Sequence, residues 1–410
     1  MLKKAIKDKK ITVGVVGLGY VGMPTALALT QAGVKVIGVD IDRTRVRRLN
    51  RAHGSKKFLA TANFAEIKKC RVVLIAVPTP ITRNKTPDVS AIEAAAKNIA
   101  KYLAKGSLVI LESTTYPGTT DELVRPLLQK SGKDFYLAYA PERIDPGNKD
   151  HAFTEVPKIV SGVDKKSTDL AAAFYLTFLK NVYKVSSPRV AEFTKLLENV
   201  FRLVNVSAIN ELKLLADKMG IDIWEVIEAA KTKPYGYMPF YPGPGVGGHC
   251  IPVDPFYLSW KAKEYGFFAR FIELAGEINE LMPHHVVTKV IWALNRVKKP
   301  LRGSKILVLG VAYKKDVDDA RETPATLIIK DLIRKGADVS YHDPHIPQFK
   351  IDGRELKSVA LSRAALKSAD CILILTDHSN VNYPAIAKSA KLIVDTRNTI
   401  KNKLPNVIRF

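Results

Sequence analysis

Cysteine is scarce in this chain of 410 residues, in which Cys70, Cys250 and Cys371 are the three cysteines. Three scattered thiols are too few for a disulfide framework or a metal cluster, so the sequence predicts a reducing compartment and no bound metal. Long apolar runs are also missing, because no stretch reaches the roughly 18 residues that a membrane-spanning helix needs. The basic start of the chain leads into no apolar signal core. We therefore expect a cytoplasmic protein without a membrane segment.

Acidic residues are outnumbered: 64 lysines and arginines stand against 40 aspartates and glutamates, a formal net charge of +24. Such a charge suits nucleic acid, an acidic membrane surface or a phosphorylated small ligand. The basic residues are spread along the whole chain, without an RNA-binding signature or interleaved aromatic residues. We interpret the charge as a solvated surface that attracts anionic substrates, with no nucleic-acid or membrane partner. A nanomolar, salt-sensitive affinity for DNA would support the non-enzymatic alternative.

The first 40 residues contain a dinucleotide-binding pattern in its full context. In order, it consists of a strand (residues 11–16), the fingerprint Gly17-Leu18-Gly19-Tyr20-Val21-Gly22, a helix (24–31), a second strand (34–39) and Asp40. The glycines allow a tight turn and a close approach of a pyrophosphate to the helix N-terminus, and the acid stands where a ribose 2′-hydroxyl is held. Asp40 would repel a 2′-phosphate, which favours NAD over NADP, although Arg43 and Arg45 leave NADP as an alternative.

Three more apolar runs predict strands that end in polar residues. The strands are residues 72–77, 108–111 and 135–140, and Thr79, Thr114 and Glu142 follow them. Ligands collect at the carboxyl ends of the strands in such sheets, so these side chains are candidates for contact with a cofactor or substrate. Each of them alone is equally typical of a turn or a helix cap.

A long helix is predicted to begin at Pro188, with Ser187 as its N-cap. Its apolar residues recur at helical spacing, which predicts a buried face made of Val190, Phe193, Leu197, Val200, Phe201 and Val204. Lys195 and Asn199 are four residues apart and share a face, a pattern that is also typical of a solvated polar stripe. With the amphipathic segments that follow, including residues 224–230 and 271–281, it predicts an all-helical middle segment that forms a dimer.

From about residue 301 a second α/β pattern begins. It comprises strands at 305–310, 338–341, 371–375 and 392–394 and a helix at 324–335. The full glycine fingerprint is missing, and Gly310 to Asp316, including Lys314, stands in its place, which favours a different phosphate ligand. Cys70 and Cys371 each precede a strand and are predicted to be packing residues. The fold class is therefore α/β, with two Rossmann-like, doubly wound domains joined by a long central helix and the helical dimerisation segment.

The stretch from Pro242 to Pro255 reads PGPGVGGHCIPVDP and places a thiol at the end of a glycine-rich loop. Glycines let a backbone lie flat against a ligand, so Cys250 is a candidate nucleophile. His249 is not assigned as its base, because adjacent residues in an extended segment point to opposite faces. A nicotinamide fold with a thiol of this kind suggests oxidation through a thiohemiacetal and a thioester. Lys195 and Asn199 would form an oxyanion hole, and Asp254 or Glu142 would steer or deprotonate water.

The chain resembles the nucleotide-sugar 6-dehydrogenases, the UDP-glucose and GDP-mannose dehydrogenase superfamily, from about residue 11 to 398. The motifs that carry the resemblance are GLGYVG at 17–22, PTP at 78–80, ESTTYPGTT at 112–120, PERIDPG at 141–147, the helix with Lys195 and Asn199, the cysteine loop, and GVAYKKDVDDARETP at 310–324. The resemblance implies a four-electron, NAD-dependent oxidation of the C6 alcohol of a sugar to a carboxylate. It implies an NAD-binding domain over 1–187, a central helical domain over 188–298, a UDP-binding domain over 299–410, and a homodimer built on the central helix.

Residue roles follow by position within these motifs. The implied catalytic residues are Cys250 as nucleophile, Lys195 and Asn199 at the oxyanion, Asp254 and Thr114 at a water, and Glu142 in thioester hydrolysis. The implied cofactor-binding residues are Gly17, Gly19, Tyr20, Val21, Gly22, Asp40, Arg45, Thr79, Thr114 and Arg321. The implied substrate-binding residues are Glu142, Arg143, Lys195, Asn199, Phe240, Tyr241, Gly247 and Lys314.

Three departures from the UDP-glucose members bear on the substrate. Pro146 stands where a second glutamate is usual, Val253 stands roughly where a lysine is usual, and the loop before Cys250 lacks an arginine. The run from Tyr235 to Trp260 is similar to enzymes of UDP-N-acetylglucosamine and UDP-N-acetylmannosamine, between which the motifs do not decide. UDP-glucose is the first alternative. More remote alternatives are a two-electron hydroxyacid dehydrogenase and a silent NAD-binding regulator, neither of which needs Cys250.

Overall fold

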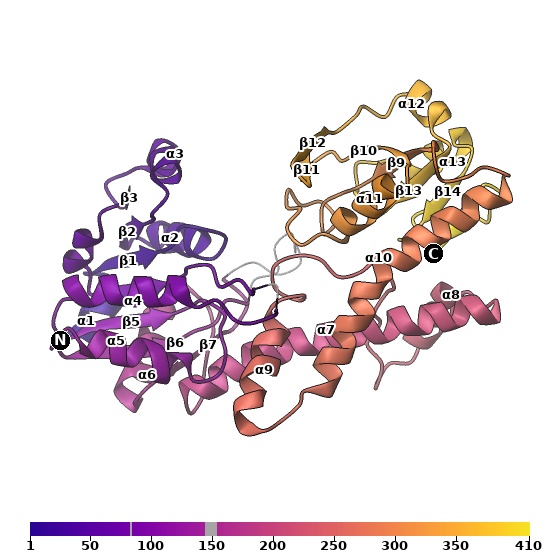
Figure 1. The fold of residues 1–410 in the computed structure, drawn as a ribbon. Helices are drawn as coiled ribbons and strands as arrows, with labels where there is room; N and C mark the ends of the chain where they lie inside the picture. The colour runs from indigo at the N-terminus through magenta and orange to yellow at the C-terminus, as the bar shows by residue number, and fades with distance from the viewer. Residues whose placement is uncertain (83, 144–153) are drawn as a thin grey trace. The chain divides into compact units, whose positions relative to one another are not determined.

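The computed structural model describes residues 1–82, 84–143 and 154–410, and these form two compact units. Unit 1 comprises Met1–Glu198 with Phe256–Phe268, and unit 2 comprises Asn199–Pro255 with Ala269–Phe410. Each unit is built on its own sheet (Figure 1). Two Rossmann-like sheets and a long helix between them in sequence agree with the predicted fold class.

Unit 1 contains a sheet of eight strands in the order β3-β2-β1-β4-β5-β6-β7-β8 among the described residues. The strands are β1 (Thr12–Val16), β2 (Lys35–Val39), β3 (Phe58–Thr61), β4 (Val72–Ile75), β5 (Ser107–Leu111), β6 (Phe135–Tyr139), β7 (Lys158–Gly162) and β8 (Val182–Lys184). All neighbours pair in parallel except β6 and β7. The order reverses at β1, whose carboxyl end leads into the glycine fingerprint, as in dinucleotide-binding sheets.

Helices cover both faces of this sheet, which explains why its strands are apolar on both sides. One core packs side chains of α1 (Leu2–Lys7), α2 (Gly22–Gln31), α3 (Arg43–His53) and α6 (Lys165–Tyr175) against the strands. The other core uses η1 (Phe64–Lys69), α4 (Ser90–Tyr102), η2 (Thr119–Val124) and α5 (Arg125–Gln129). Cys70 lies in this second core and is fully buried, which confirms that it is a packing residue; burial raises the pKa of its thiol to about 12.

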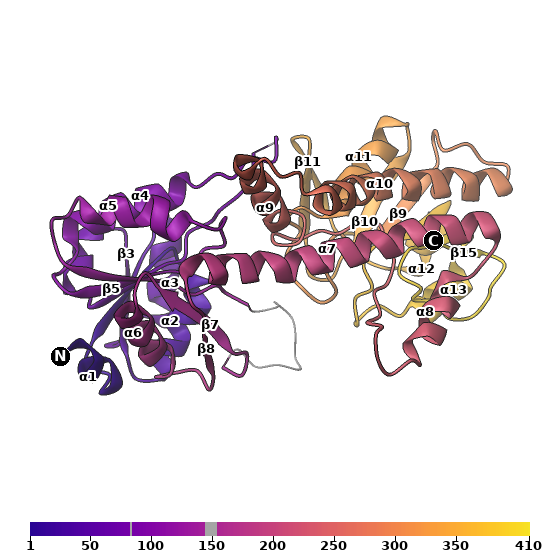
Figure 2. The same ribbon diagram turned by 90° about the horizontal axis from the view of Figure 1, so that it is seen from below.

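The predicted long helix is α7 (Pro188–Met219), a single unbroken helix (Figure 2). Its buried face is not the predicted apolar one. Val190, Phe193, Leu197 and Phe201 are 42, 45, 55 and 46% exposed in the single chain. The face that is buried carries Ala191, Glu192, Lys195, Leu196, Asn199 and Leu203. The prediction was wrong because periodicity shows that a helix has an apolar stripe, but does not show whether this chain itself covers it.

Unit 2 contains a parallel sheet in the order β10-β9-β13-β14-β15 and a separate antiparallel hairpin. The strands are β9 (Lys305–Leu309), β10 (Asp338–His342), β13 (Cys371–Ile374), β14 (Ile393–Asp395) and β15 (Val407–Arg409), with β11 (Gln348–Ile351) and β12 (Arg354–Lys357) in the hairpin. The helices are α8 (Ile223–Lys231), α10 (Arg270–Arg296), α11 (Pro324–Arg334), α12 (Arg363–Ser368) and α13 (Tyr383–Ser389). Cys371 is fully buried on β13 and, as predicted, is a packing residue.

Helix α10 continues well beyond the predicted end at Leu281, and Pro283 lies inside it. A proline in a helix interior removes one hydrogen bond and usually ends or kinks the helix. Here Met282, Val286, Val287 and Val290 are buried in the core of unit 2, so burial outweighs the lost bond. Within the described ranges, no helix combines the length and the apolar character needed to cross a bilayer.

Candidate functional site

Unit 1 positions the three fingerprint glycines, and two of them are required by the fold itself. Gly17 has φ +92°, and a Cβ there would lie 2.5 Å from the Ala76 carbonyl oxygen. A Cβ on Gly22 would lie 1.9 Å from the Gly17 carbonyl oxygen, so the helix can approach the strand only without a side chain. Gly19 is different, because its φ lies outside the left-handed region and a Cβ there would meet nothing within 4 Å. Nothing in the described parts of the protein requires a glycine at position 19. Gly19 therefore fits a backbone that a pyrophosphate approaches closely.

Asp40 is buried at the carboxyl end of β2 and fixes the same turn. Its Oδ2 accepts a hydrogen bond from the Leu18 amide at 2.9 Å, and its Oδ1 accepts one from the Asp42 amide at 2.9 Å. Arg45 Nη1 also donates to Asp40 Oδ2, at 3.0 Å. The acid and Arg45 thus lie together beside the fingerprint, where Tyr20 is exposed and Val21 precedes α2. These residues fit a bound NAD, for which Asp40 and Arg45 were predicted to hold the adenosine end.

Replacing Gly19 by alanine is expected to weaken NAD binding by about tenfold or more without destabilising the protein. The space around Gly19 is empty, so the new methyl group costs nothing in the fold but obstructs a close pyrophosphate. Isothermal titration with NAD and a thermal melt check the two halves of this statement. Gly22→Ala is the control that should lose stability, because its methyl group overlaps the Gly17 carbonyl. Unchanged NAD affinity in Gly19→Ala would contradict the assignment.

Thr79 and Thr114 follow adjacent strands of unit 1. Thr79 is buried, and its carbonyl oxygen accepts a hydrogen bond at 2.8 Å from the hydroxyl of Tyr257 on α9 (Asp254–Ala262). Thr114 is half-buried within the ESTTYPGTT motif, next to Ser113, whose hydroxyl donates to the Val77 carbonyl at 2.7 Å. The two loops are therefore tied to each other and to α9 through main-chain groups.

The ESTTYPGTT motif is also anchored by Glu192, which the sequence reasoning missed. The Glu192 carboxylate accepts hydrogen bonds from the amide of Gly118 at 2.6 Å, the amide of Thr120 at 2.9 Å and the Thr120 hydroxyl at 2.6 Å. Burial raises the pKa of Glu192 to about 7, because its effect outweighs that of these hydrogen bonds, which lower the pKa. Glu192 lies one turn before Lys195 on α7, and Lys195 is buried with it. The available signal was that Glu192, Lys195 and Asn199 fall on one helical face.

Glu142 and Arg143 follow β6 and are both engaged within unit 1. Glu142 Oε2 lies 2.9 Å from the Nζ of Lys158, and its Oε1 accepts the Arg143 amide at 2.7 Å. The Arg143 guanidinium forms an ion pair with Glu198 on α7 at 2.7 Å and donates to the Pro157 carbonyl at 2.8 Å. These contacts hold the start of the PERIDPG motif against α7. Pro146 lies outside the described residues.

In unit 2, the glycines of the cysteine loop are explained by the protein itself. Gly248 has φ +86° and its amide donates to the Arg321 carbonyl at 3.2 Å. A Cβ on Gly247 would lie 2.8 Å from the Glu322 carbonyl oxygen, and one on Gly248 would lie 2.7 Å from the Tyr313 ring. The glycines were expected to let the backbone approach a ligand; in the structure they let the loop lie against residues 313–324.

At the end of this loop, Cys250 is exposed, whereas Cys70 and Cys371 are buried. Its carbonyl oxygen accepts the Asp254 amide at 2.8 Å, which starts α9 directly behind the thiol. The Asp254 carboxylate is buried and accepts a hydrogen bond from Asn199 Nδ2 at 2.6 Å. Asn199 and Asp254, which the sequence placed in separate motifs, thus form one buried pair. Lys195 lies one turn before Asn199 on α7.

The remaining predicted residues of unit 2 are Arg321, Phe240, Tyr241 and Lys314. Arg321 Nε and Nη2 bind the Asp319 carboxylate, at 3.0 and 2.7 Å. Burial and the charge of Arg321 lower the pKa of His249. Phe240 packs edge-on against Phe201 with ring centroids 5.7 Å apart, and the Tyr241 ring stacks on Trp224 at 5.9 Å. Lys314 is half-buried in the loop after β9.

Comparison with known proteins matches most of the chain to one family. The NAD binding domain of the UDP-glucose/GDP-mannose dehydrogenase family matches residues 11–55 and 51–185, its central domain matches 189–281, and its UDP binding domain matches 307–402. The chain belongs to the UDP-glucose/GDP-mannose dehydrogenase family. It is thus an NAD-dependent nucleotide-sugar dehydrogenase, and the predicted cofactor and enzyme class are confirmed.

Several relatives match over nearly their full length. An NDP-N-acetyl-D-galactosaminuronic acid dehydrogenase of Ralstonia nicotianae is 37% identical over 97% of this chain and 98% of its own. A UDP-N-acetyl-D-glucosamine 6-dehydrogenase of Pseudomonas aeruginosa is 36% identical over 82% of this chain and 84% of its own. The solved structure of a UDP-D-ManNAc dehydrogenase of Pyrococcus horikoshii has a TM-score of 0.87 and 34% identity, covering 97% of this chain and 98% of that one.

The UDP-binding domain of this dehydrogenase shares one structural feature with the NAD-binding domain: an aspartate at the end of a strand that accepts hydrogen bonds from backbone amides of a neighbouring turn. Asp343, at the end of β10, accepts hydrogen bonds from the amides of Val311 and Ala312 at 2.7 and 2.9 Å, as Asp40 accepts that of Leu18. Asp343 Oδ2 also lies 3.1 Å from His378 Nε2, whereas the side-chain partner of Asp40 Oδ2 is Arg45. Burial raises the pKa of Asp343, but the hydrogen bonds from His378 and the backbone amides outweigh burial and lower it to about 2. Asp343 is therefore occupied by the protein itself.

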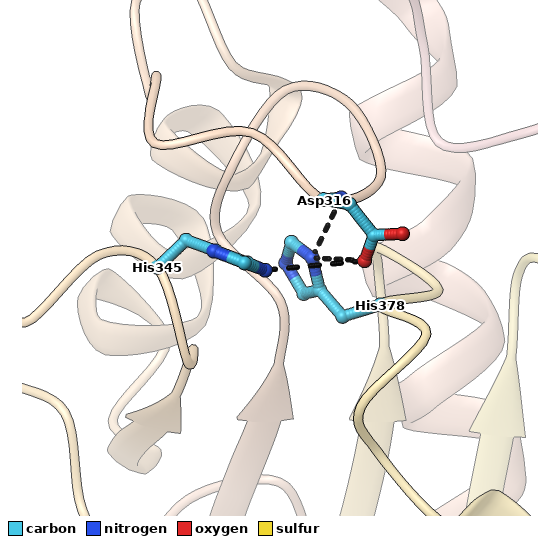
Figure 3. Close-up of side chains that lie close together, drawn as sticks. All are labelled: Asp316, His345 and His378. Atoms are coloured by element: carbon cyan, nitrogen blue, oxygen red, sulfur yellow. Dashed lines mark hydrogen bonds and ion pairs between the residues drawn. The ribbon is translucent and has the colours of Figure 1, made fainter. Parts of the chain in front are cut away.

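His378 also belongs to a group with Asp316 and His345, which lie side by side in Figure 3. One ligand atom from each lies within 4.8 Å of the others, a spacing that a metal site would also show. However, His378 Nδ1 accepts the Asp316 amide at 3.0 Å, so both of its ring nitrogens are used in hydrogen bonds. The hydrogen bonds of His378 therefore link the ends of β10 and β13 to the loop that carries Lys314. The sequence analysis did not single out these residues.

Proposed function

We propose that this dehydrogenase oxidises the C6 hydroxyl of a UDP-N-acetylhexosamine to the uronic acid in two steps, through a covalent intermediate on Cys250. NAD, which the fingerprint glycines and Asp40 would hold, would supply the hydride acceptor for each oxidation. Between the two oxidations, the Cys250 thiolate adds to the aldehyde carbon and forms a thiohemiacetal, whose oxidation yields a thioester. The observation that carries the proposal is the exposed thiol on a loop fixed by Arg321 and Glu322, directly before the buried Asn199–Asp254 pair.

The residues of α7 serve the charge that develops on the substrate oxygen. Lys195 and Asn199 are one turn apart on the buried face of the helix, and a cation and an amide N–H are the donors that stabilise an oxyanion. Asp254 holds the Asn199 amide in a fixed orientation, so the donor is in place before the reaction begins. Burial strengthens these interactions because the surrounding dielectric constant is low.

Hydrolysis of the thioester needs a water molecule and a group that takes its proton. We assign the water to Asp254 and Thr114, and the proton to Glu142. Both Glu142 oxygens have neighbours that hold the carboxylate in one orientation, since Lys158 and the Arg143 amide lie at 2.9 and 2.7 Å. Lys314 contacts the UDP-sugar and Arg321 the cofactor in this scheme. Phe240, Tyr241 and Gly247 line the substrate.

The sugar is assigned from the departures at Val253 and in the loop before Cys250, and the named relatives, which act on N-acetylated sugars, support it. We expect NAD-dependent oxidation of UDP-N-acetylmannosamine or UDP-N-acetylglucosamine, with UDP-glucose turned over at least about tenfold less efficiently, as a missing contact of 1.4 kcal/mol would cause. A panel of UDP-sugars with NAD, followed by mass spectrometry of the acid product, tests this. A preference for UDP-glucose would replace the proposed substrate by its alternative.

We propose that the enzyme acts as a homodimer. Val190, Phe193, Leu197 and Phe201 form a continuous apolar stripe on α7 that the single chain leaves exposed. Exposed apolar patches of this kind mark protein interfaces, and the same stripe on a second copy would cover it by two-fold symmetry. Light scattering should then give twice the 45.3 kDa of one chain, and a monomeric mass would refute the dimer.

A further inference from the structure

A buried network of charged groups lies behind Glu142 in unit 1. Lys158, at the start of β7, has its Nζ 2.9 Å from Glu142 Oε2 and 3.3 Å from Glu112 Oε1. Glu112 follows β5 directly and begins the ESTTYPGTT motif. The hydroxyl of Tyr175, on α6, donates to Glu112 Oε1 at 2.6 Å, and the Lys158 ammonium lies 5.2 Å from the centre of the Tyr175 ring. The network therefore connects the candidate hydrolytic base to two fully buried side chains.

Among the residues that the structure describes, the charges of this network do not balance. Two carboxylates face one ammonium, and the side chains of Glu112 and Lys158 are only 0 and 5% exposed. Burial raises the pKa of Glu112, and the nearby Glu142 raises it further. Lys158 and Tyr175 lower it, but the net pKa is raised. Burial lowers the pKa of Lys158, but the two carboxylates outweigh it and the net pKa is raised. Lys158 therefore stays an ammonium, and the proton that the network can still take up goes to a carboxylate.

One atom of the network is placed to receive that proton. Among the described residues, Glu112 Oε2 is buried and has no hydrogen-bond partner. A buried carboxylate oxygen without a partner is costly, and a purely structural site could be filled with apolar side chains at no loss of stability. Uptake of a proton at Glu112 would bring the net charge of the three groups from −1 to 0, whereas release of a proton would bring it to −2. The network is thus suited to accept a proton and not to supply one.

We propose that Lys158 is a positioning residue that holds Glu142, and that Glu112 stores the proton that Glu142 takes from water when the thioester is hydrolysed. This inference rests on the proposed function. Water oxygen bonds to the thioester carbon, the carbon–sulfur bond breaks, and its electron pair leaves with the Cys250 sulfur, which takes one proton. Glu142 takes the other proton. Lys158 then passes one of its own protons to Glu112 and receives the one on Glu142, which restores the Glu142 carboxylate while the acid product leaves. The stored proton then returns by the same route, through Lys158 and Glu142 to water, so that Glu112 is a carboxylate again before the next turnover.

The proposal separates hydrolysis from the oxidations that precede it. In Lys158→Met, Glu142 loses the ammonium that lies 2.9 Å from its Oε2, so hydrolysis should slow by about 10²-fold or more while both oxidations continue. We expect a rapid burst of two NADH per active site followed by slow turnover. Intact-protein mass spectrometry should then show the acyl group of the nucleotide sugar on the enzyme, a product that loss of fold would not create. Lys158→Arg should again hold Glu142 and so clear the acyl adduct, but a guanidinium does not give up a proton, so its steady rate should stay about tenfold low, as expected for Glu112→Gln.

Glu112→Gln tests the proton store without removing the Tyr175 contact, because the amide oxygen still accepts that hydroxyl. One negative charge beside Glu142 is lost, so the acid limb of the kcat profile should move to lower pH. The steady rate should fall about tenfold. An unchanged pH profile would leave Glu112 without a part in the reaction and would overturn this half of the proposal.

Lys213→Met is the matched control, because Lys213 is also buried and paired, with Asp217. It lies 18 residues after Lys195 on α7, about 27 Å along a helix at 1.5 Å per residue. It should show normal turnover and no acyl adduct. A Lys158→Met enzyme that loses the burst along with turnover, or that hydrolyses at the normal rate, overturns the inference. A wild-type yield of one NADH per sugar refutes the proposed function instead.

Discussion

Replacing Cys250 by serine is expected to lower turnover by about 10⁴-fold or more. Loss of a catalytic nucleophile in other covalent enzymes has effects of this size. The Cys250 side chain is exposed, and its backbone carbonyl, not its sulfur, accepts the Val253 and Asp254 amides that start α9. The exchange of sulfur for oxygen should therefore leave the loop intact. A serine hydroxyl is far less ionised than a thiol, so the aldehyde would no longer be captured efficiently.

The measurement is the yield of NADH per sugar, together with the rate. The wild-type enzyme should release two NADH for each sugar, and Cys250→Ser should stall before the acid is formed. Cys70→Ser is the control, because the buried Cys70 sulfur donates to the Glu66 carbonyl, and a serine hydroxyl can make the same bond. A yield of one NADH per sugar with an active Cys250→Ser enzyme would favour a two-electron dehydrogenase.

Asn199→Asp is expected to reduce kcat by about 10²- to 10³-fold near neutral pH, the usual cost of one oxyanion donor. The substitution nearly preserves shape but places two carboxylates across the 2.6 Å that now holds the Asn199–Asp254 hydrogen bond. Both side chains are buried, so ionising both is costly; the Arg202 guanidinium, which donates to Asn199 Oδ1, offsets only part of this cost, and we expect the pair to share a proton. Activity should recover partly as the pH falls, because a protonated carboxyl group can donate the bond that the amide now makes.

A pH profile of kcat and KM for the variant checks this expectation. Asn205→Asp is the matched control on the same helix, where the Asn205 amide donates to the Phe201 carbonyl at an exposed position. It should leave kcat unchanged. Wild-type turnover by Asn199→Asp at every pH would show that the pair has no part in oxyanion stabilisation.

Much of the site was predictable because its residues follow local rules. The ends of the strands, the fingerprint turn, Pro188 at the start of α7 and the two packing cysteines follow from backbone sterics and apolar periodicity, which act over a few residues. The four-residue spacing of Lys195 and Asn199 is likewise a property of one helix. Residues that depend on partners far away in the sequence were missed: Glu192, which holds Gly118 and Thr120, and Lys158, which joins Glu112 to Glu142.

The errors have the same physical origin. The apolar stripe of α7 was expected to be buried, yet the structure buries the face that carries Glu192, Lys195 and Asn199. Burial depends on which surfaces meet in space, and a polar face can be buried where its groups find partners. A helical segment was expected over residues 271–281, but helix α10 continues through Pro283, and the buried residues beyond the proline keep it intact. In both cases packing between distant segments outweighed a local preference.

The amino-acid sequence by itself determined the two Rossmann-like patterns, the NAD fingerprint and the cysteine at the end of a glycine-rich loop, since these depend on φ and ψ preferences and side-chain spacing within short segments. The tertiary structure alone decided that Asn199 meets Asp254, that His378 lies beside Asp343, and that Glu112 and Lys158 lie behind Glu142. Those contacts join residues 16 to 55 positions apart, and their energies arise only when folding removes the charged and polar groups from water.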